Sequence, residues 1–353
     1  MDNDILDGLL SAIPLPSLAI DASEHIVAAN AEALTLIGQQ AQGRNYVTIL
    51  RQPALLDTIE ATLEDGQART TRYLSNDGAQ DTTYNVSCRA VSSAKRSASE
   101  VVVLVFEDIT MVEQASQMRR DFVANVSHEM RTPLTALMGF IETLRGPARD
   151  DKAASTRFLD IMQDEAERMN RLVGDLMSLN RVETDERVRP TATVILNDVL
   201  ESTMRTLRHL AKEASVTFEA DIPDTPVAMN GDADQLKQVF TNLIENAIKY
   251  GGSGGRITIR LTTSTRETAL RAAGARVQII DYGPGIDPVH LPRLTERFYR
   301  GDDHRSRALG GTGLGLAIVK HIINRHRGRL RVHSELGQGA TFTVILPILG
   351  NFD

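Results

Sequence analysis

The chain has 353 residues and a hydrophobic fraction of 42%, which is ordinary for folded protein and sufficient for two or three domains. Its formal net charge of -7 excludes binding to nucleic acid through overall charge, so we expect no direct contact with DNA or RNA. Cys88 is the single cysteine, which excludes an internal disulfide framework and a cysteine-only zinc site. We expect Cys88 to be a buried strand residue.

The chain carries neither a secretory signal nor a membrane span in its sequence pattern. No positive charge precedes an apolar run at the N-terminus, and no stretch reaches the roughly 18 uncharged apolar residues that a span requires. A cytoplasmic protein is therefore expected. Whether an upstream membrane segment has been removed stays open, as does a membrane-associated partner.

Residues 1–110 mix short apolar alternations with turn signals and predict a small α/β domain. Strands are expected at 18–21, 26–29 and 101–106, and a helical segment is expected between Asn30 and Gly38. This order resembles a PAS sensor domain. A flavin photosensor of that fold has its cysteine in an Asn-Cys-Arg context, whereas Cys88 follows Val-Ser, so light sensing by that chemistry is not expected.

From residue 111 the apolar period changes to that of a helix. Apolar residues recur every four positions from Met118 to Leu134 and continue to Leu144, while a second such run extends from Phe158 to Leu179. Gly146 and the proline after it separate the two runs. Residues 111–186 thus predict a helical hairpin, and its long apolar stripe favours pairing with a second copy into a four-helix bundle. We expect a homodimer.

Residues 190–350 follow a short linker and alternate helices with strands. Asp232 is a predicted N-cap for a helix that extends through Tyr250. Strands are expected at 256–261, 277–280, 330–333 and 341–346. An α/β sandwich is the predicted architecture, which makes the whole chain an α+β multidomain protein.

His128 lies opposite the apolar stripe when positions are stepped around the first helix, with Thr132 one turn further on. Residues 122–134 resemble the H-box of sensor histidine kinases almost residue for residue. The resemblance implies that His128 is the phosphoryl acceptor. An imidazole with an ordinary pKa near 6.5 is partly unprotonated at neutral pH, and Glu129 is expected to take the proton of its other ring nitrogen. We expect all three groups to face solvent.

The spacing of His128, Glu129 and Thr132 resembles that of family members that also dephosphorylate their response regulator. There the threonine position is implicated in orienting the attacking water. Pro133 lacks an amide hydrogen and crowds the preceding turn, so a bend is expected near 130–133.

Four motifs between residues 234 and 342 resemble the nucleotide-binding boxes of the kinase, gyrase, chaperone and mismatch-repair ATPases. In the first box, polar residues at three- and four-residue spacings share one helical side. The resemblance assigns Mg²⁺ to Asn246, phosphate to Lys249, the nucleotide to Tyr250 and the adenine amino group to Asp281. An amide oxygen suits magnesium, which also keeps waters and phosphate oxygens.

The remaining boxes are the segment 296–300 and the glycine loop 310–316. Thr295 stands where the family often has phenylalanine. The glycine loop opens a helix whose N-terminal amides could bind phosphate, residues 301–309 are expected to form a lid over ATP, and no Walker-type lysine loop is present. The resemblance assigns these residues to the nucleotide: Asn242, Glu245, Asn246, Lys249, Tyr250, Asp281, Gly283, Gly285, Ile286, Arg297, Phe298, Arg300, Gly311, Thr312, Gly313, Leu314, Gly315, Leu316 and Thr341.

The resemblance implies a protein histidine kinase that uses ATP and Mg²⁺ to phosphorylate His128 and passes the phosphoryl group to a response regulator aspartate. It is greatest to kinases of the phosphate regulon, which implies phosphate-starvation signalling and an upstream membrane-complex regulator. A chaperone or topoisomerase subunit would share the ATP boxes but lack the H-box. A degenerate scaffold would be expected to lose Asn246 or Asp281. Transfer within one subunit and transfer between two subunits stay open.

Overall fold

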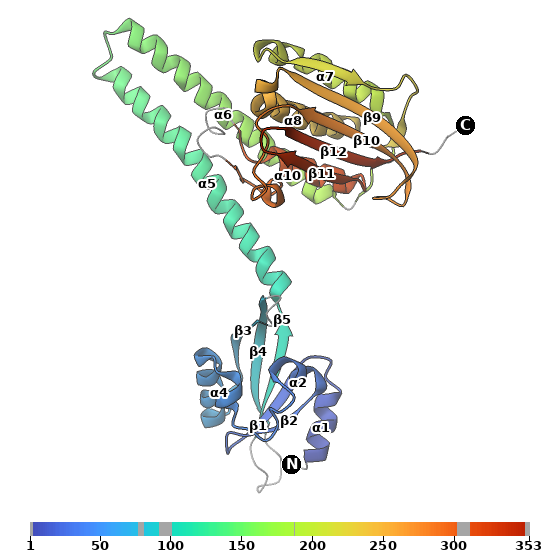
Figure 1. Cartoon of the computed structure of the whole chain (residues 1–353). Helices are drawn as coiled ribbons and strands as arrows, with labels where there is room; N and C mark the ends of the chain where they lie inside the picture. The colour runs from blue at the N-terminus through green and yellow to red at the C-terminus, as the bar shows by residue number, and fades with distance from the viewer. Residues whose placement is uncertain (1–2, 77–80, 92–100, 187, 302–310, 350–353) are drawn as a thin grey trace. The chain divides into compact units, whose positions relative to one another are not determined.

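The structure is a computed structural model that describes residues 3–76, 81–91, 101–186, 188–301 and 311–349 (Figure 1). The chain divides into two compact units, Met1–Ala124 and Asn125–Asp353. The expected lid at 301–309 falls almost wholly outside the described residues.

The N-terminal unit is built on a five-stranded antiparallel sheet with the strand order β2-β1-β5-β4-β3. The strands predicted at 18–21, 26–29 and 101–106 are confirmed, and two further strands complete the sheet. The bounds are β1 Ser17–Asp21, β2 Ile26–Ala29, β3 Arg69–Asn76, β4 Asp81–Val91 and β5 Val101–Asp108.

Four helices accompany this sheet: α1 Asn3–Ser11, α2 Ala31–Ile37, α3 Tyr46–Leu50 and α4 Pro53–Asp65. Helix α2 occupies the predicted segment and ends at Gly38. Its N-cap residue Asn30 accepts hydrogen bonds from the amides of Ala33 and Ser17, both at 2.9 Å. One buried side chain therefore caps the helix and joins it to β1.

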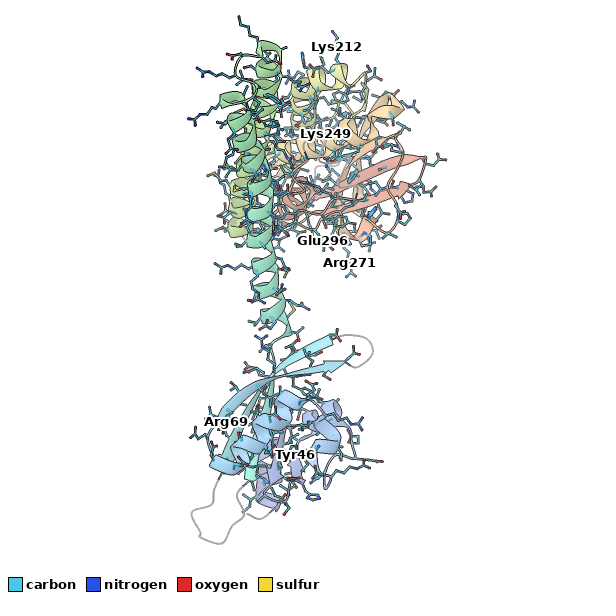
Figure 2. All side chains as sticks on the ribbon, turned by 90° about the vertical axis from the view of Figure 1, so that its left-hand side faces the viewer. Tyr46, Arg69, Lys212, Lys249, Arg271 and Glu296 are labelled. Carbon is cyan, nitrogen blue, oxygen red and sulfur yellow. The ribbon has the colours of Figure 1, made fainter. Side chains whose placement is uncertain are left out.

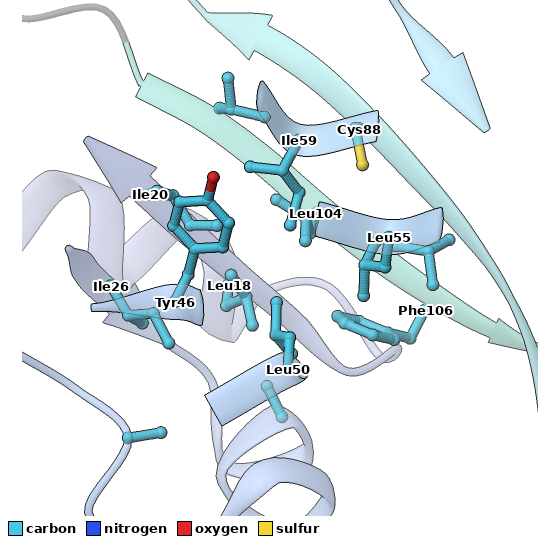
Figure 3. Packing of buried hydrophobic residues seen from close by; sticks show 14 residues of the cluster. Leu18, Ile20, Ile26, Tyr46, Leu50, Leu55, Ile59, Cys88, Leu104 and Phe106 are labelled. Atoms are coloured by element: carbon cyan, nitrogen blue, oxygen red, sulfur yellow. The ribbon is translucent and has the colours of Figure 1, made fainter. Parts of the chain in front are cut away.

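The sheet of the N-terminal unit separates two apolar clusters, because alternate strand residues point to opposite faces. Leu104 and Phe106 of β5 lie in the larger cluster, together with Cys88 and Tyr46 (Figure 3). Val101 belongs to the smaller cluster, which contacts α1. Cys88 is fully buried on β4, as predicted, and burial raises the pKa of its thiol to about 12.

The predicted helical hairpin is formed by α5 Thr110–Arg145 and α6 Lys152–Asp185. Asp151 caps α6 by accepting hydrogen bonds from two amides at 3.0 Å. The rings of Phe140 and Phe158 stack across the hairpin with centroids 5.4 Å apart. Helix α5 continues through Pro133 to Arg145, so the proline does not end it.

Residues 193–347 form two layers, as the sandwich prediction requires. One layer is a mixed sheet with the order β11-β12-β10-β9-β7, in which β7 pairs in parallel with β9. Helices α7, α8 and α10 pack together as the second layer (Figure 1). The bounds are β7 Thr217–Asp221, β9 Arg256–Glu267, β10 Ala272–Asp281, β11 Arg329–Glu335, β12 Gly339–Pro347, α7 Leu196–Glu213, α8 Ala233–Gly251 and α10 Gly315–Arg325.

Several elements of this region were not expected from the sequence. A small two-stranded sheet joins β6 Thr193–Ile195 to β8 Ala228–Asn230, and short 3₁₀ helices occupy Gly252–Gly254 and Leu291–Arg293. Asp232 caps α8 as predicted, accepting a hydrogen bond from the Gln235 amide at 3.1 Å. Within the described part of the chain, no helix combines the length and apolarity needed to cross a membrane.

Candidate functional site

His128 is exposed on α5, as its position opposite the apolar stripe predicts. Thr132 is also exposed, and its hydroxyl donates a hydrogen bond to the backbone carbonyl of His128 at 3.2 Å. This contact fixes the hydroxyl one helical turn beyond the imidazole. The ring of His128 is therefore accessible to a phosphoryl donor, and the oxygen of Thr132 lies on the same surface.

Glu129 does not face open solvent, and the expectation of three exposed groups was wrong for this residue. Its Oε2 accepts hydrogen bonds from Arg300 at 2.9 Å and from Arg168 at 3.3 Å. A helix turns its side chains by about 100° per residue, which carries Glu129 from the face of His128 toward α6. The predicted base is thus held by one arginine of the hairpin and one of the sandwich.

The first nucleotide box lies on α8, where its polar residues are half-buried. The Asn242 side chain donates a hydrogen bond to the Gly315 carbonyl at 3.3 Å, which joins α8 to the first residue of α10. Lys249, which is labelled in Figure 2, lies on this helix. It forms an ion pair with Glu245 at 3.0 Å across one helical turn. Asn246 lies on the same helix, four residues after Asn242 and three before Lys249.

Asp281 ends β10 and is only 6% exposed. Its Oδ1 accepts hydrogen bonds from the Gly283 amide at 3.0 Å and from the Ala340 amide at 3.2 Å. Burial raises the pKa of this carboxyl, and the two amide bonds oppose the shift. Both of these donors use one oxygen of the carboxylate.

Glycines allow the backbone to approach Asp281 closely. A Cβ on Gly251 would lie 2.4 Å from Cγ of Asp281, and one on Gly283 would lie 2.5 Å from Cα of Gly251. Gly285 has φ +74°, and its Cβ would lie 2.1 Å from the Glu335 carbonyl oxygen. The end of α8 and the loop after β10 therefore meet at a position that larger residues would block.

The glycine loop leads directly into α10. Gly313 has φ +72°, and its carbonyl accepts a hydrogen bond from the Phe298 amide at 2.9 Å. The Thr312 hydroxyl accepts a hydrogen bond from the Leu314 amide at 3.3 Å and donates one to Oδ2 of Asp175 at 2.6 Å. The loop thus contacts α6 through a residue that the resemblance assigned to the nucleotide.

Arg297 contacts α6 in this structure. It donates a hydrogen bond to Glu183 at 2.6 Å, and the His321 ring lies 2.9 Å from a carboxylate oxygen of Glu186. Sequence reasoning missed Asp175 and Glu183, because no local motif marks a carboxylate that meets a residue more than a hundred positions away. It also missed Arg168, whose partner Glu129 lies 39 positions away on the other helix of the hairpin.

The other predicted nucleotide residues occupy the same region of the sandwich. The Ile286 amide donates a hydrogen bond to the Ser334 hydroxyl at 2.8 Å, and Thr341 lies on β12 opposite Ile280. Tyr250 is half-buried near the end of α8, and Leu314 is fully buried. Of the remaining members, Gly311 lies in the glycine loop, and Gly315 and Leu316 are the first two residues of α10.

Asn246 is an amide, and a single amide oxygen cannot by itself hold a divalent cation. Among the described residues, no three His, Cys, Asp or Glu side chains are grouped as a preformed metal site. The amide oxygen of Asn246 suits Mg²⁺, which is commonly held by one or two protein ligands together with phosphate oxygens and water. The donor set thus fits a metal that arrives with a nucleotide.

Two family comparisons match separate parts of the chain. Residues 118–185 match the His Kinase A (phospho-acceptor) domain. Residues 231–350 match the histidine kinase-, DNA gyrase B-, and HSP90-like ATPase. The matched segments contain the hairpin with His128 and the sandwich with Asp281.

Comparison with curated proteins gives relatives of the same kind. The chain is 42% identical over 241 residues to the phosphate regulon sensor protein PhoR of Pseudomonas aeruginosa, covering 68% of this chain and 53% of that protein. It is 38% identical over 255 residues to the sensor histidine kinase WalK of Bacillus subtilis, covering 70% and 39% respectively. The matched region therefore spans about half of these relatives or less.

A solved structure agrees in fold. The histidine kinase ThkA, determined in complex with the response regulator protein TrrA, aligns with a TM-score of 0.50 at 20% identity and covers 96% of this chain and 97% of that chain. With its phospho-acceptor hairpin and its ATPase sandwich, the chain belongs to the sensor histidine kinases.

Proposed function

We propose that the chain phosphorylates its own His128 from ATP. The observation that carries this proposal is an exposed histidine beside Glu129, whose carboxylate is bound by Arg300 of the ATPase sandwich. Acceptor, base and nucleotide domain thereby meet in one unit of the chain.

In the proposed step, one ring nitrogen of His128 attacks the γ-phosphorus of ATP. A nitrogen–phosphorus bond forms, the bond from the γ-phosphorus to the bridging oxygen breaks, and ADP leaves with the electron pair. Glu129 takes the proton from the other ring nitrogen and so stabilises the charge that develops on the imidazole. Because Arg300 and Arg168 hold Glu129 here, this carboxylate must turn toward the ring before it can act.

The nucleotide would occupy the side of the sandwich formed by Asp281, α8 and the glycine loop. Since Oδ1 of Asp281 receives two amides, we assign Oδ2 to the adenine amino group. Asn246 would hold Mg²⁺, which neutralises phosphate charge when bound. Lys249 and the amides at the start of α10 would bind phosphate oxygens.

The phosphoryl group would then pass to an aspartate of a response regulator. Thr132 would support the opposing phosphatase activity, in which water hydrolyses the phospho-aspartate to aspartate and phosphate. The likeness to PhoR supports phosphate-starvation signalling.

Residues 111–186 would form the homodimer, since Leu134 and Ile141 are 49% and 43% exposed in the single chain. The strand order β2-β1-β5-β4-β3 supports a PAS-like sensor in residues 1–110. A cytoplasmic position and an upstream membrane-complex regulator complete the proposal.

The test is incubation of the purified chain with γ-labelled ATP and Mg²⁺. We expect an acid-labile, base-stable phosphoryl group that His128→Ala abolishes. His209→Ala is the matched control, because this histidine lies on α7 with its side chain 83% exposed. Undiminished label on the His128 variant would overturn the acceptor assignment, and an unlabelled wild-type chain that still binds a response regulator would indicate a scaffold instead.

A further inference from the structure

Asp175 of α6 contacts the glycine loop at the point where phosphate binding is proposed. The Thr312 hydroxyl donates its proton to Oδ2 of Asp175 at 2.6 Å, and the oxygen of that hydroxyl accepts the Leu314 amide at 3.3 Å. A hydroxyl has one proton to donate. While it is bound to Asp175, the Thr312 hydroxyl is not available to donate to a phosphate oxygen.

The charges around Asp175 also belong to the proposed nucleotide site. Burial raises the pKa of Asp175, and its bond with Thr312 opposes that shift. Glu245 raises the pKa further, whereas Lys249 and Arg171 lower it. Asp175 therefore senses the electrostatic field of α8 residues that the sequence assigned to the nucleotide.

A second carboxylate of the hairpin is bound in a parallel way. Glu129 accepts a hydrogen bond from Arg300, whose side chain is only 5% exposed and whose Nε is buried without a hydrogen-bond partner among the residues described. A cavity of about 10 Å³ lies here, lined by Glu129, Arg168 and Thr312 among others. That volume is near the minimum for one water molecule. Two residues assigned to an anionic ligand are thus both occupied by hairpin carboxylates.

Resting on the kinase function proposed above, we propose that Asp175 determines the nucleotide preference of the site, because its carboxylate competes with a nucleotide phosphate for the Thr312 hydroxyl. When α6 is docked on the glycine loop, nucleotides whose phosphates reach Thr312 bind more weakly than they would without Asp175. Binding of such a nucleotide in turn releases Thr312 from α6. The same interaction energy governs both directions.

The competition has two physical components. A phosphate oxygen and the Asp175 carboxylate cannot both accept the single hydroxyl proton of Thr312. Both groups are also anionic, and their repulsion is screened only weakly in a partly buried site. Adenosine carries no phosphate, so it neither competes for the Thr312 hydroxyl nor is repelled by the Asp175 charge. The predicted signature is therefore an effect that depends on the phosphates of the ligand.

The test measures binding of adenosine, ADP and the β,γ-imido analogue of ATP to the full-length chain by calorimetry in Mg²⁺. Asp175→Asn keeps an oxygen that accepts from Thr312 but removes the charge. We expect it to strengthen binding of the analogue about tenfold and to leave adenosine within about twofold. Asp164→Asn is the matched control, because Asp164 is an exposed aspartate of the same helix.

A double-mutant cycle tests the hydroxyl itself. Thr312→Val should weaken binding of the analogue more in an Asp175→Ala background than in the wild-type chain, since the hydroxyl is then free for phosphate. Thr312→Ser should restore the wild-type behaviour. Additive effects of the two substitutions would overturn the competition, as would equal gains for adenosine and the analogue in Asp175→Asn.

Failure of the inference is distinguishable from failure of the proposed function. If the wild-type chain binds none of the three ligands, the nucleotide site itself is wrong. If it binds them and incorporates label at His128 while Asp175→Asn binds like the wild type, only the role of Asp175 is wrong.

Discussion

Gly251, the last residue of α8, lies directly against the side chain of Asp281. A Cβ on this glycine would be 2.4 Å from Cγ of the aspartate, far inside van der Waals contact. The helix that carries the proposed metal and phosphate residues is thereby placed against the proposed adenine acceptor. The fit depends on the absence of one methyl group.

Gly251→Ala is expected to displace Asp281 and to weaken adenine nucleotide binding at least tenfold. Overpacking of a close contact typically costs about 1–3 kcal/mol of stability as well. Gly252→Ala is the matched control, because its Cβ would meet only Val216 at an ordinary 3.5 Å. The measurements are the nucleotide affinity by calorimetry and the free energy of unfolding in urea, each compared between the two variants. Normal binding by Gly251→Ala would show that Asp281 does not need its present position.

Thr132→Ala is expected to reduce phosphatase activity while sparing autophosphorylation. Its hydroxyl donates to the His128 carbonyl, so its oxygen lies one helical turn beyond His128 on the exposed surface, where it can orient a water. Loss of one such bond costs about 1–3 kcal/mol of barrier, or roughly ten- to hundredfold in rate.

The measurement for Thr132 pairs the initial rate of autophosphorylation with the decay of a purified phospho-regulator. Thr135→Ala is the control, since Thr135 is an exposed threonine of the same helix. Equal loss of both activities in Thr132→Ala would assign a structural role to Thr132.

Asp281→Asn is expected to retain its fold and lose adenine recognition. The amide oxygen of asparagine can still accept the Gly283 and Ala340 amides, but its other terminus becomes a donor that opposes the adenine amino group. Binding of ATP should fall about tenfold or more, since a buried unmatched pair costs about 1–3 kcal/mol. Competition between ATP and GTP for each variant supplies the readout, and an unchanged preference for ATP would disprove the assignment.

His326 should make the sandwich sensitive to acid. Its Nε2 accepts a hydrogen bond from the Asp232 amide at 3.0 Å, and its Nδ1 lies 2.8 Å from the Ile322 carbonyl oxygen. Burial is the main reason that the pKa of His326 is lowered, and Arg325 lowers it further. The Ile322 carbonyl and Asp232 oppose this shift. Both hydrogen bonds are made by the neutral ring with its proton on Nδ1.

Because the folded pKa lies below the ordinary value of about 6.5, the unfolded chain takes up the proton first as pH falls. The neutral ring contributes its full stabilisation at pH values above about 6.5. As the pH falls below this value, the free energy of unfolding declines by at most about 1.4 kcal/mol per pH unit. His326→Gln, which keeps an acceptor for Asp232, should show a smaller loss between pH 7.5 and 5.5 in urea unfolding of the full chain. His209→Gln should behave like wild type. Parallel pH profiles for all three proteins would contradict the prediction.

The helices and the motif-bearing turns could be predicted because their signals are local. The four-residue apolar period indicated α5, Asp232 marked the start of α8, and an unbroken apolar run indicated β5. The small sheet of β6 and β8 lacked any such signal, because strands of three residues are too short to show a period.

The environment of Glu129 was predicted incorrectly for a related reason. The period of a helix says which face a side chain occupies but not which domain covers that face. Contact of Glu129 with Arg300 joins positions far apart in sequence, as does contact of Asp175 with Thr312. Such pairs follow from the packing of α6 against α10, which has no counterpart in any single motif.

Cys88 provides a chemical reporter of the N-terminal unit. It is the single thiol of the chain, it is fully buried beside Leu104 and Phe106, and burial raises its pKa to about 12. The thiolate that reacts with alkylating reagents therefore forms only when the sheet opens. The alkylation rate of unmodified protein would measure how often the N-terminal unit opens, and a ligand that binds this unit would slow that rate without any label being introduced.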